Sequence, residues 1–430
     1  MLTFHITSLG CPKNTVDAEI ILGNATARGL VPVENPADAD VLIVNTCGFI
    51  REAKEESLEA IFDVVGRYPD HRLVVMGCLV QRYRSELERD IPEVEAWFGV
   101  GELDAVAEHV AAGAAVAGSD TATGGKGSLL RGAWGYIKVS DGCDHRCSFC
   151  AIPLIKGPYR GEPLASILDQ ADQVLAEGAR ELVLVGQDTA LWHEDGCSLP
   201  ELVERLAEDP RVARVRLMYL QPEHVDERLL EVVAGHPRVC RYLDMPFQHA
   251  SRAVLRRMRR WGDAHDYLDL IGKARARMPD VSLRSTFIVG FPGETEDDFQ
   301  QLLDFVTEAD LDHAGAFAFS AEEGTAAAVL EPRVSPRVTR KRLARLTSAL
   351  LDVGELRTVG RIGSNVEVLV DGPAPPDAPE GIVAVGRTEG QAPEVDGVTY
   401  LLGPRMPVRG EVVVAEVVDA AGFDLFAEMS

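Results

Sequence analysis

The sequence predicts an α/β protein in three parts: an N-terminal open parallel sheet flanked by helices, a central run of about six βα units, and a small antiparallel C-terminal β-barrel. Two patterns support this prediction. Short apolar strands alternate with segments of helical period through the first 110 residues and again from 133 to 357. The tail then changes to short valine-rich strands separated by glycine and proline. We expect domains at 1–112, 133–357 and 358–430, with a linker at 113–132.

The expected N-terminal sheet carries a cysteine after each of three strands. Cys11, Cys47 and Cys78 lie just past the carboxyl ends of these strands, each beside a glycine. Because such ends meet at one edge of an open parallel sheet, we expect the three thiols to converge there. A chance placement is the alternative to an iron–sulfur cluster with one open iron. The expected strands and helices run in the order 2–7, 14–27, 41–44, 50–65, 73–76 and 81–91.

A second triplet, Cys143, Cys147 and Cys150, has the spacing CxxxCxxC on one short loop. Three thiolates so spaced can bind three irons of a cubane cluster and leave the fourth iron open. A structural zinc site is one alternative, with His145 as its fourth ligand. Three buried cysteines acting as small hydrophobes are another, although the polar neighbours of the triplet argue against burial.

The central part begins with a strand at 135–139 that leads directly into this cysteine loop, after a linker rich in Ala, Gly, Ser and Thr. About six βα units are too few for a closed eight-stranded barrel, and the active site should lie at the carboxyl ends of the strands. Polar residues there are candidate pocket residues, with turns and helix caps as the alternative. The candidates are Gln187, Asp188, Gln248 and Glu294. The other expected strands are 181–185, 212–217, 241–245, 281–289 and 314–319.

Composition restricts the partners. The formal charge of −25 argues against sequence-independent binding of nucleic-acid backbones and favours a basic partner. Without a leader-like start or a membrane-length apolar run, the chain is expected to be soluble and cytoplasmic. In that reducing compartment, cysteines serve as ligands more often than as disulfides. The isolated Cys197 and Cys240 are expected to be structural, and the basic run at 252–260 to form a solvated helix face.

The CxxxCxxC loop, with an aromatic residue before its last cysteine, resembles the radical S-adenosylmethionine (SAM) enzymes. That resemblance implies an open partial barrel and a 4Fe–4S cluster on Cys143, Cys147 and Cys150 that binds SAM. It also implies a 5'-deoxyadenosyl radical that abstracts hydrogen from an unactivated carbon. By the same resemblance, Gln187, Asp188, Gln248 and Glu294 would contact SAM or the substrate. The radical step requires no acid or base, and no catalytic side chain is predicted.

The runs at 8–14, 45–48 and 77–78, together with CxxxCxxC, resemble the methylthiotransferases among these enzymes, over nearly the whole chain. The family implies a second, auxiliary 4Fe–4S cluster on Cys11, Cys47 and Cys78. It also implies an external electron donor, a sulfur source, and a C-terminal substrate-recruiting barrel known as TRAM. The run at 156–162 departs from the family's more usual Arg-Ser-Arg, whereas the run at 258–260 resembles a family motif near the active site.

The charge composition of the C-terminal segment indicates which branch of the family the chain resembles. Residues 361–430 contain four arginines, no lysine and twelve acidic residues, which suits a basic protein better than RNA. The start at 8–14 also resembles the branch that methylthiolates the β-carbon of an aspartate in the small-subunit ribosomal protein numbered twelve. RNA contact would then be indirect, on the ribosome. The alternatives are a tRNA adenosine methylthiotransferase and a non-catalytic iron–sulfur carrier.

Overall fold

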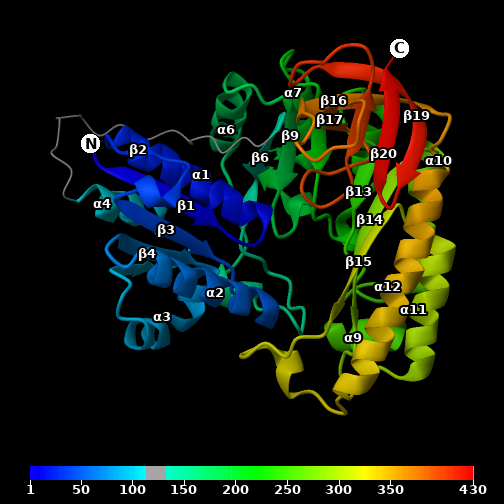
Figure 1. The fold of residues 1–430 in the computed structure, drawn as a ribbon. Coiled ribbons are helices and arrows are strands. Elements are labelled where there is room, and N and C mark those ends of the chain that lie inside the picture. The colour runs from blue at the N-terminus through cyan, green and yellow to red at the C-terminus, as the bar shows by residue number, and fades with distance from the viewer. Residues whose placement is uncertain (113–131, 195, 430) are drawn as a thin grey trace.

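The computed structural model describes residues 1–112, 132–194 and 196–429. A central βα domain lies between an N-terminal sheet domain and a C-terminal barrel (Figure 1). The α/β architecture predicted from the sequence is confirmed. The predicted linker at 113–132 falls, except for its last residue, outside the described residues. The predicted domain boundaries stay predictions.

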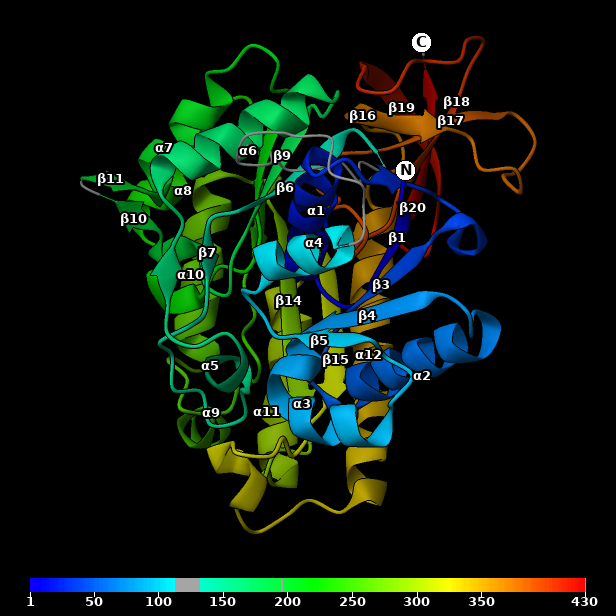
Figure 2. The ribbon, with the colours of Figure 1, turned by 90° about the vertical axis from the view of Figure 1, so that its left-hand side faces the viewer.

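The N-terminal domain is a parallel sheet in the order β2-β1-β3-β4-β5, with helices on both faces (Figure 2). Alternate residues of β3 serve the two faces: Val41 and Ile43 pack with α1 and α4, and Leu42 and Val44 with α2 and α3. The bounds are β1 (Thr3–Ser8), α1 (Pro12–Ala27), β2 (Val31–Pro32), η1 (Pro36–Asp38), β3 (Val41–Thr46), α2 (Arg51–Arg67), β4 (Arg72–Gly77), α3 (Cys78–Asp90), β5 (Ala96–Phe98) and α4 (Leu103–Ala111).

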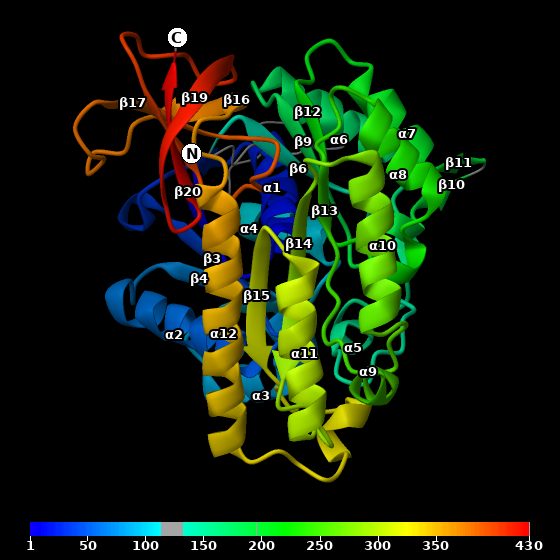
Figure 3. The same ribbon diagram turned by 90° about the vertical axis from the view of Figure 1, so that its right-hand side faces the viewer.

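The central domain is an open barrel of parallel strands in chain order. The groups β6-β9-β12 and β13-β14-β15 are joined through a bridge between Val215 and Val239. Figure 3 shows α10, α11 and α12 side by side outside β14 and β15. The bounds are β6 (Trp134–Lys138), β7 (Ser140–Asp141), α5 (Ile152–Ile155), β8 (Arg160–Gly161), α6 (Leu164–Ala176), β9 (Glu181–Val185), η2 (Thr189–Leu191), β10 (His193–Glu194), β11 (Cys197–Ser198), α7 (Leu199–Ala207), β12 (Arg214–Leu217), η3 (Pro222–His224), α8 (Glu227–Gly235), β13 (Tyr242–Asp244), α9 (Arg252–Met258), α10 (Ala264–Arg277), β14 (Ser282–Val289), α11 (Glu296–Ala309), β15 (His313–Ala318), η4 (Ala326–Val329) and α12 (Pro336–Val359).

The C-terminal domain is a closed barrel in the order β16-β17-β18-β20-β19. Its core consists of the inward-facing residues of these strands, such as Val413, Ala415 and Val417 of β19. Neighbouring strands pair antiparallel except for β18 and β20, which pair parallel. The bounds are β16 (Asn365–Pro373), β17 (Ile382–Arg387), β18 (Thr399–Leu402), β19 (Val412–Ala421) and β20 (Asp424–Met429).

Both flanking domains fill the hollow of the open barrel. Val16 of α1 and Ala392 of the segment 388–398, which we call the plug loop, pack in one cluster with inward-facing residues of the barrel such as Val183 and Tyr242. A single sheet curved through six strands leaves an interior that its own side chains do not fill. The three domains therefore share one apolar cluster inside the open barrel.

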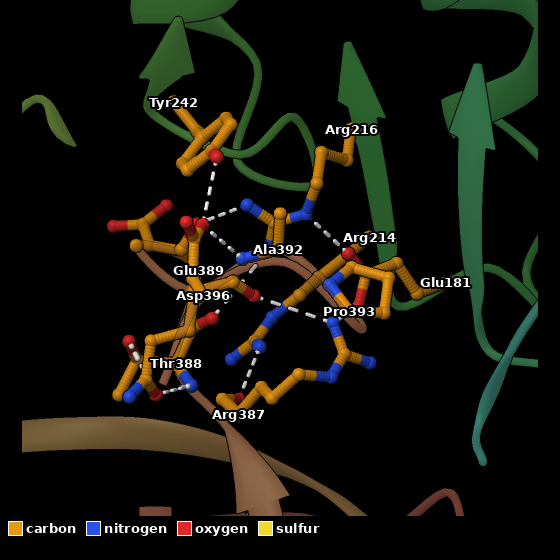
Figure 4. A network of polar contacts seen from close by, with 12 residues as sticks. Glu181, Arg214, Arg216, Tyr242, Arg387, Thr388, Glu389, Ala392, Pro393 and Asp396 are labelled. Atoms are coloured by element: carbon orange, nitrogen blue, oxygen red, sulfur yellow. Dashed lines mark hydrogen bonds and ion pairs between the residues drawn. The ribbon is translucent and has the colours of Figure 1, made fainter. Parts of the chain in front are cut away.

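Buried ion pairs hold the plug loop in place (Figure 4). The carboxylate of Glu181 on β9 pairs with Arg216 Nε at 2.6 Å and with Arg387 Nη1 at 2.8 Å. Arg216 also donates to the backbone oxygen of Glu389 at 2.8 Å, and the Tyr242 hydroxyl donates to Asp396 at 2.7 Å. The C-terminal barrel is thereby fixed to the amino-terminal ends of the central strands.

Charges also fix the N-terminal domain. Asp17 of α1 accepts from Lys138 Nζ at 2.6 Å and from Lys156 Nζ at 3.0 Å, with all three side chains buried. Burial alone would raise the pKa of Asp17, but the two ammonium groups outweigh it and hold the pKa below its usual value. Farther along the interface, Glu322 pairs with Lys54 at 2.8 Å and Arg82 at 2.7 Å.

Replacing Asp17 by alanine is expected to lower the free energy of unfolding by about 3 kcal/mol, because it leaves two ammonium groups buried without their main partner. Urea titration followed by circular dichroism would measure the change. The matched control is Asp63→Ala, which breaks an exposed pair with Arg67 and should cost at most about 0.5 kcal/mol. Equal losses in the two variants would contradict the prediction.

Candidate functional site

Cys11, Cys47 and Cys78 lie at the carboxyl edge of the N-terminal sheet, with Cys11 directly before α1 and Cys78 as the first residue of α3. A side chain on Gly10 would place its Cβ 2.7 Å from Cys47 Cβ and 3.0 Å from Cys47 Sγ. One on Gly48 would lie 2.8 Å from the backbone carbonyl of Cys78. The glycines beside the cysteines therefore permit this approach, and the three segments converge as the strand pattern predicts.

Polar side chains fix these loops. Asn14 Nδ2 donates to the backbone oxygens of Leu9 at 2.8 Å and Thr46 at 3.2 Å, and its Oδ1 lies 3.8 Å from Cys78 Sγ. Ser57 Oγ accepts from the Cys47 amide at 3.0 Å and donates to the Cys47 carbonyl at 2.9 Å. Ser57 was not predicted, because nothing in the sequence around it in α2 distinguishes it from an ordinary helical serine.

Burial raises the pKa of Cys47 and raises that of Cys78 to about 12. The neighbouring thiols of the triplet add to the shift. Such thiols are protonated at neutral pH, and a bound cation is what makes their thiolates favourable. Three adjacent thiols suit a soft, multiply charged metal cluster.

The second triplet lies between β7 and α5. The loop begins at Gly142, where a Cβ would lie 2.0 Å from the Pro158 carbonyl oxygen, and the Cys143 amide donates to Gly157 O at 3.1 Å. Ser148 ties the loop to α9 through Met258 O at 2.9 Å and Arg257 O at 2.7 Å. The backbone is thus fixed on both sides of the cysteines.

Cys143, Cys147 and Cys150 line one cavity of about 510 Å³, together with Arg259 and residues 324–326. Burial raises the pKa of Cys143 to about 11 and that of Cys150 to about 12. Among the described residues that line the cavity there is no fourth cysteine. The donor set fits a cubane cluster with one iron free for another ligand.

His145 is engaged elsewhere, which weighs against the zinc alternative. Its Nε2 lies 2.8 Å from Asp188 Oδ2, and its Nδ1 lies 3.4 Å from Glu223 Oε1. His224, which was not predicted, donates from Nδ1 to the same Asp188 oxygen at 2.7 Å. Burial would raise the pKa of Asp188, but its bonds to the two histidines lower it, and the bond to Asp188 raises the pKa of His224.

The predicted pocket residues have different surroundings. Asp188 Oδ1 and Gln187 Oε1, at the end of β9, are buried and have no partner among the described residues. Gln248 lines a second cavity, discussed below. Glu294 bonds Arg342 Nη1 at 2.8 Å and the amides of Gly290 and Phe291, so its carboxylate supports its own loop. That these residues contact a cofactor stays a prediction.

Part of the basic run reaches the site: the default expectation of a solvated helix face does not hold for Arg259 and Arg260, which belong to the run that resembles a family motif. Arg260 Nη1 lies 3.8 Å from Cys147 Sγ, and its Nη2 donates to Pro246 O at 2.8 Å. Arg259 lies at the cavity with a left-handed backbone at φ +56°. Because the helix α9 ends at Met258, these two residues turn away from the helical face that periodicity predicts.

Three family models match successive parts of the chain: "Uncharacterized protein family UPF0004" at 3–99, "Radical SAM superfamily" at 137–306 and "TRAM domain" at 362–429. Among solved structures, the radical SAM methyltransferase TsrM from Kitasatospora setae has a TM-score of 0.54 at 16% identity, covering 74% of each chain. The cobalamin-dependent SAM radical enzyme OxsB has a TM-score of 0.53 at 13% identity, covering 81% of this chain and 56% of its own. At such identities these structures show the fold alone.

The fold and the cysteine loop thus define a radical SAM enzyme, a class that binds a 4Fe–4S cluster and SAM. Curated relatives identify the family within this class. "Ribosomal protein uS12 methylthiotransferase RimO" from Sorangium cellulosum is 40% identical over 445 residues, covering 99% of this chain and 90% of the relative. The protein of the same name from Moorella thermoacetica is 42% identical, covering 96% of each. The chain belongs to the RimO family of methylthiotransferases, and the predicted resemblance is confirmed.

A membrane-spanning helix was not expected from the sequence. Within the described ranges, every helix is too short or too polar to cross a bilayer.

Proposed function

We propose that this chain transfers a methylthio group to the β-carbon of an aspartate in ribosomal protein uS12. The observation that carries the proposal is that the segments bearing the two cysteine triplets pack against each other. Cys78 packs directly against Ala151, the residue after Cys150, and against Ile155 of α5. Two open clusters, one for SAM and one for sulfur, would then serve the same reacting carbon.

In this proposal Cys143, Cys147 and Cys150 hold the SAM-binding cluster, and Cys11, Cys47 and Cys78 hold an auxiliary 4Fe–4S cluster. When bound, the SAM cluster and SAM supply a radical able to remove hydrogen from an unactivated carbon. The chain's own residues position these groups. The ion pairs of Glu322 with Lys54 and Arg82 fix the N-terminal domain against the central domain, and so fix the two triplets relative to each other. Arg260 places positive charge beside Cys147. An external electron donor and a sulfur source complete the proposal.

The surface of the C-terminal barrel favours a basic protein over tRNA. Glu416 and Glu428 face each other on β19 and β20, with Asp419 and Glu367 also exposed. The barrel's arginines are engaged: Arg387 is buried with Glu181 and Asp371, Arg361 lies against Asp312, Arg405 pairs with Glu411, and Arg409 bonds Gly132 O. Because all four arginines in the described part of the barrel are engaged, its face carries mainly negative charge, which complements a ribosomal protein rich in lysine and arginine better than it does phosphates.

Mass spectrometry of two substrates tests the proposal. The cluster-reconstituted enzyme is incubated with SAM, sulfide and a strong reductant, and with either isolated uS12 or bulk tRNA. We expect a methylthio increment on one aspartate of uS12 and none on tRNA, with no increment in the control that lacks SAM. An increment on tRNA alone would make the chain a tRNA methylthiotransferase. Failure to cleave SAM would favour the iron–sulfur carrier.

A further inference from the structure

A second cavity, of about 220 Å³, lies where the N-terminal domain meets the open side of the central barrel. Phe49 lines one side, and Phe317 of β15 lines another and is 50% exposed, so the cavity opens to the surface. Phe149 contributes a further wall. The cavity is therefore mainly apolar and can be reached by a side chain of another molecule.

The cavity lies between the two cysteine triplets. Phe49 comes two residues after Cys47, and Phe149 directly precedes Cys150. The segment 322–325 contributes Glu322 to this cavity and Gly324 and Thr325 to the cavity that the second triplet lines. A group bound here would contact loops that carry both sets of thiols.

Polar groups at the inner wall are available to a ligand. The side chains of Gln248 and Thr286 line the cavity, and neither makes a hydrogen bond to another of the described residues. Ser320 differs, because its hydroxyl bonds Glu322 at 2.7 Å. Gln248 and Thr286 thus offer hydrogen-bond donors beside an apolar wall, the usual composition of a small-ligand site.

The backbone of Gln248 is held in an unfavourable conformation. Its φ is +70°, in the left-handed region that glycine and asparagine favour. Two bonds to β14 enforce it: Gln248 N donates to Thr286 O at 2.8 Å, and Ile288 N donates to Gln248 O at 2.7 Å. Backbone strain at a residue whose side chain has no protein partner is typical of ligand-binding positions.

We propose that this cavity binds the side chain of the aspartate that is modified. The Gln248 amide and the Thr286 hydroxyl donate hydrogen bonds to its carboxylate, and the aromatic walls enclose its β-carbon. This inference rests on the proposed function, and it assigns Gln248 to the substrate instead of the cofactor. The described residues that line the cavity include no lysine or arginine, so neutral donors and not a cation hold the substrate carboxylate. Glu322, which also lines the cavity, has its charge compensated by Lys54 at 2.8 Å and Arg82 at 2.7 Å.

The test measures how tightly the reconstituted enzyme with SAM binds a peptide that carries the uS12 target loop, by isothermal titration calorimetry. Gln248→Glu replaces a donor with a carboxylate that repels the substrate, and we expect at least a ~10-fold weaker Kd. Gln301→Glu makes the same change at an exposed position of α11 and should leave the Kd unchanged. Iron content and thermal midpoint establish that each variant is folded and loaded.

A swapped peptide separates recognition from a structural role. Replacing the target aspartate with asparagine supplies an amide donor, so the Gln248→Glu enzyme should bind this peptide at least ~3-fold more tightly than the aspartate peptide, and the parent enzyme should not. Equal Kd values of Gln248→Glu and Gln301→Glu for the aspartate peptide would overturn the inference. A parallel titration with tRNA would also overturn it if Gln248→Glu weakened the binding of tRNA and not that of the peptide. If the parent enzyme binds the peptide but leaves it unmodified, the proposed function fails separately.

Discussion

Cys147→Ala is expected to remove about four iron atoms per chain and to abolish cleavage of SAM. Two remaining thiols, Cys143 and Cys150, cannot hold a cubane cluster in a cavity where burial raises their pKa to about 11 and 12. The N-terminal triplet keeps its own three thiols, and Asn14 and Ser57 still hold the segments that carry them. Iron analysis and chromatography of 5'-deoxyadenosine measure the two effects.

Cys197→Ala is the matched control. Cys197 lies on β11, outside the cavity that the second triplet lines, and its Sγ makes a weak hydrogen bond of 3.9 Å to Ser198 O. Iron content and SAM cleavage should equal those of the parent chain. If Cys147→Ala retained cleavage, the CxxxCxxC loop would not be the SAM site.

Glu181→Ala is expected to lower the free energy of unfolding by about 3–5 kcal/mol, the largest stability effect we predict. Glu181 is fully buried and is the shared anion of Arg216 and Arg387, whose side chains are 0% and 2% exposed. Its removal leaves two buried guanidinium groups without that carboxylate. Denaturant unfolding measures the loss, and Asp269→Ala, which breaks an exposed pair with Lys273, should leave the free energy of unfolding nearly unchanged.

The same carboxylate makes the free energy of unfolding depend on pH. Burial would raise the pKa of Glu181, but Arg216 and Arg387 outweigh it and lower the pKa to about 2. A folded-state pKa below the usual 4.5 means that stabilisation is complete above pH 4.5 and is lost as the pH falls towards 2. Acid unfolding of the parent chain should therefore be steeper in this range than that of Glu181→Ala. Equal slopes would contradict the ion pair.

The sequence predicts the repeating parts of the fold well because their signals are local. The apolar run Glu181–Val185 is β9 as expected, and the cysteines converge because every parallel strand ends at the same edge. Short edge strands lack such a signal: β2 and β5 have two and three residues and become strands only through pairing with β1 and β4. The parallel pairing of β18 with β20 is likewise a property of barrel closure that no local pattern encodes.

The candidate site is predictable in its cysteines and not in its surroundings. Spacing singles out Cys143, Cys147 and Cys150, and position after a strand singles out Cys11, Cys47 and Cys78. The partners of Asp188, in contrast, include His224, which is distant in sequence and has no motif. Glu294 and Gln248 both follow strands of the barrel, yet one is engaged with Arg342 and the other faces a cavity. Which of the two occurs depends on tertiary packing, since position after a strand is the same signal for both.

The plug loop has a consequence for how the molecule can be divided. Sequence families split the chain into three modules, but Ala392 and Val16 complete the core of a barrel that neither belongs to. Deleting residues after 361 would open the base of the central barrel to water and leave Arg214 and Arg216 without the carbonyls of 367, 387 and 389. The three regions that the family models match are therefore not independent folding units, and heating the chain should unfold them in a single cooperative transition.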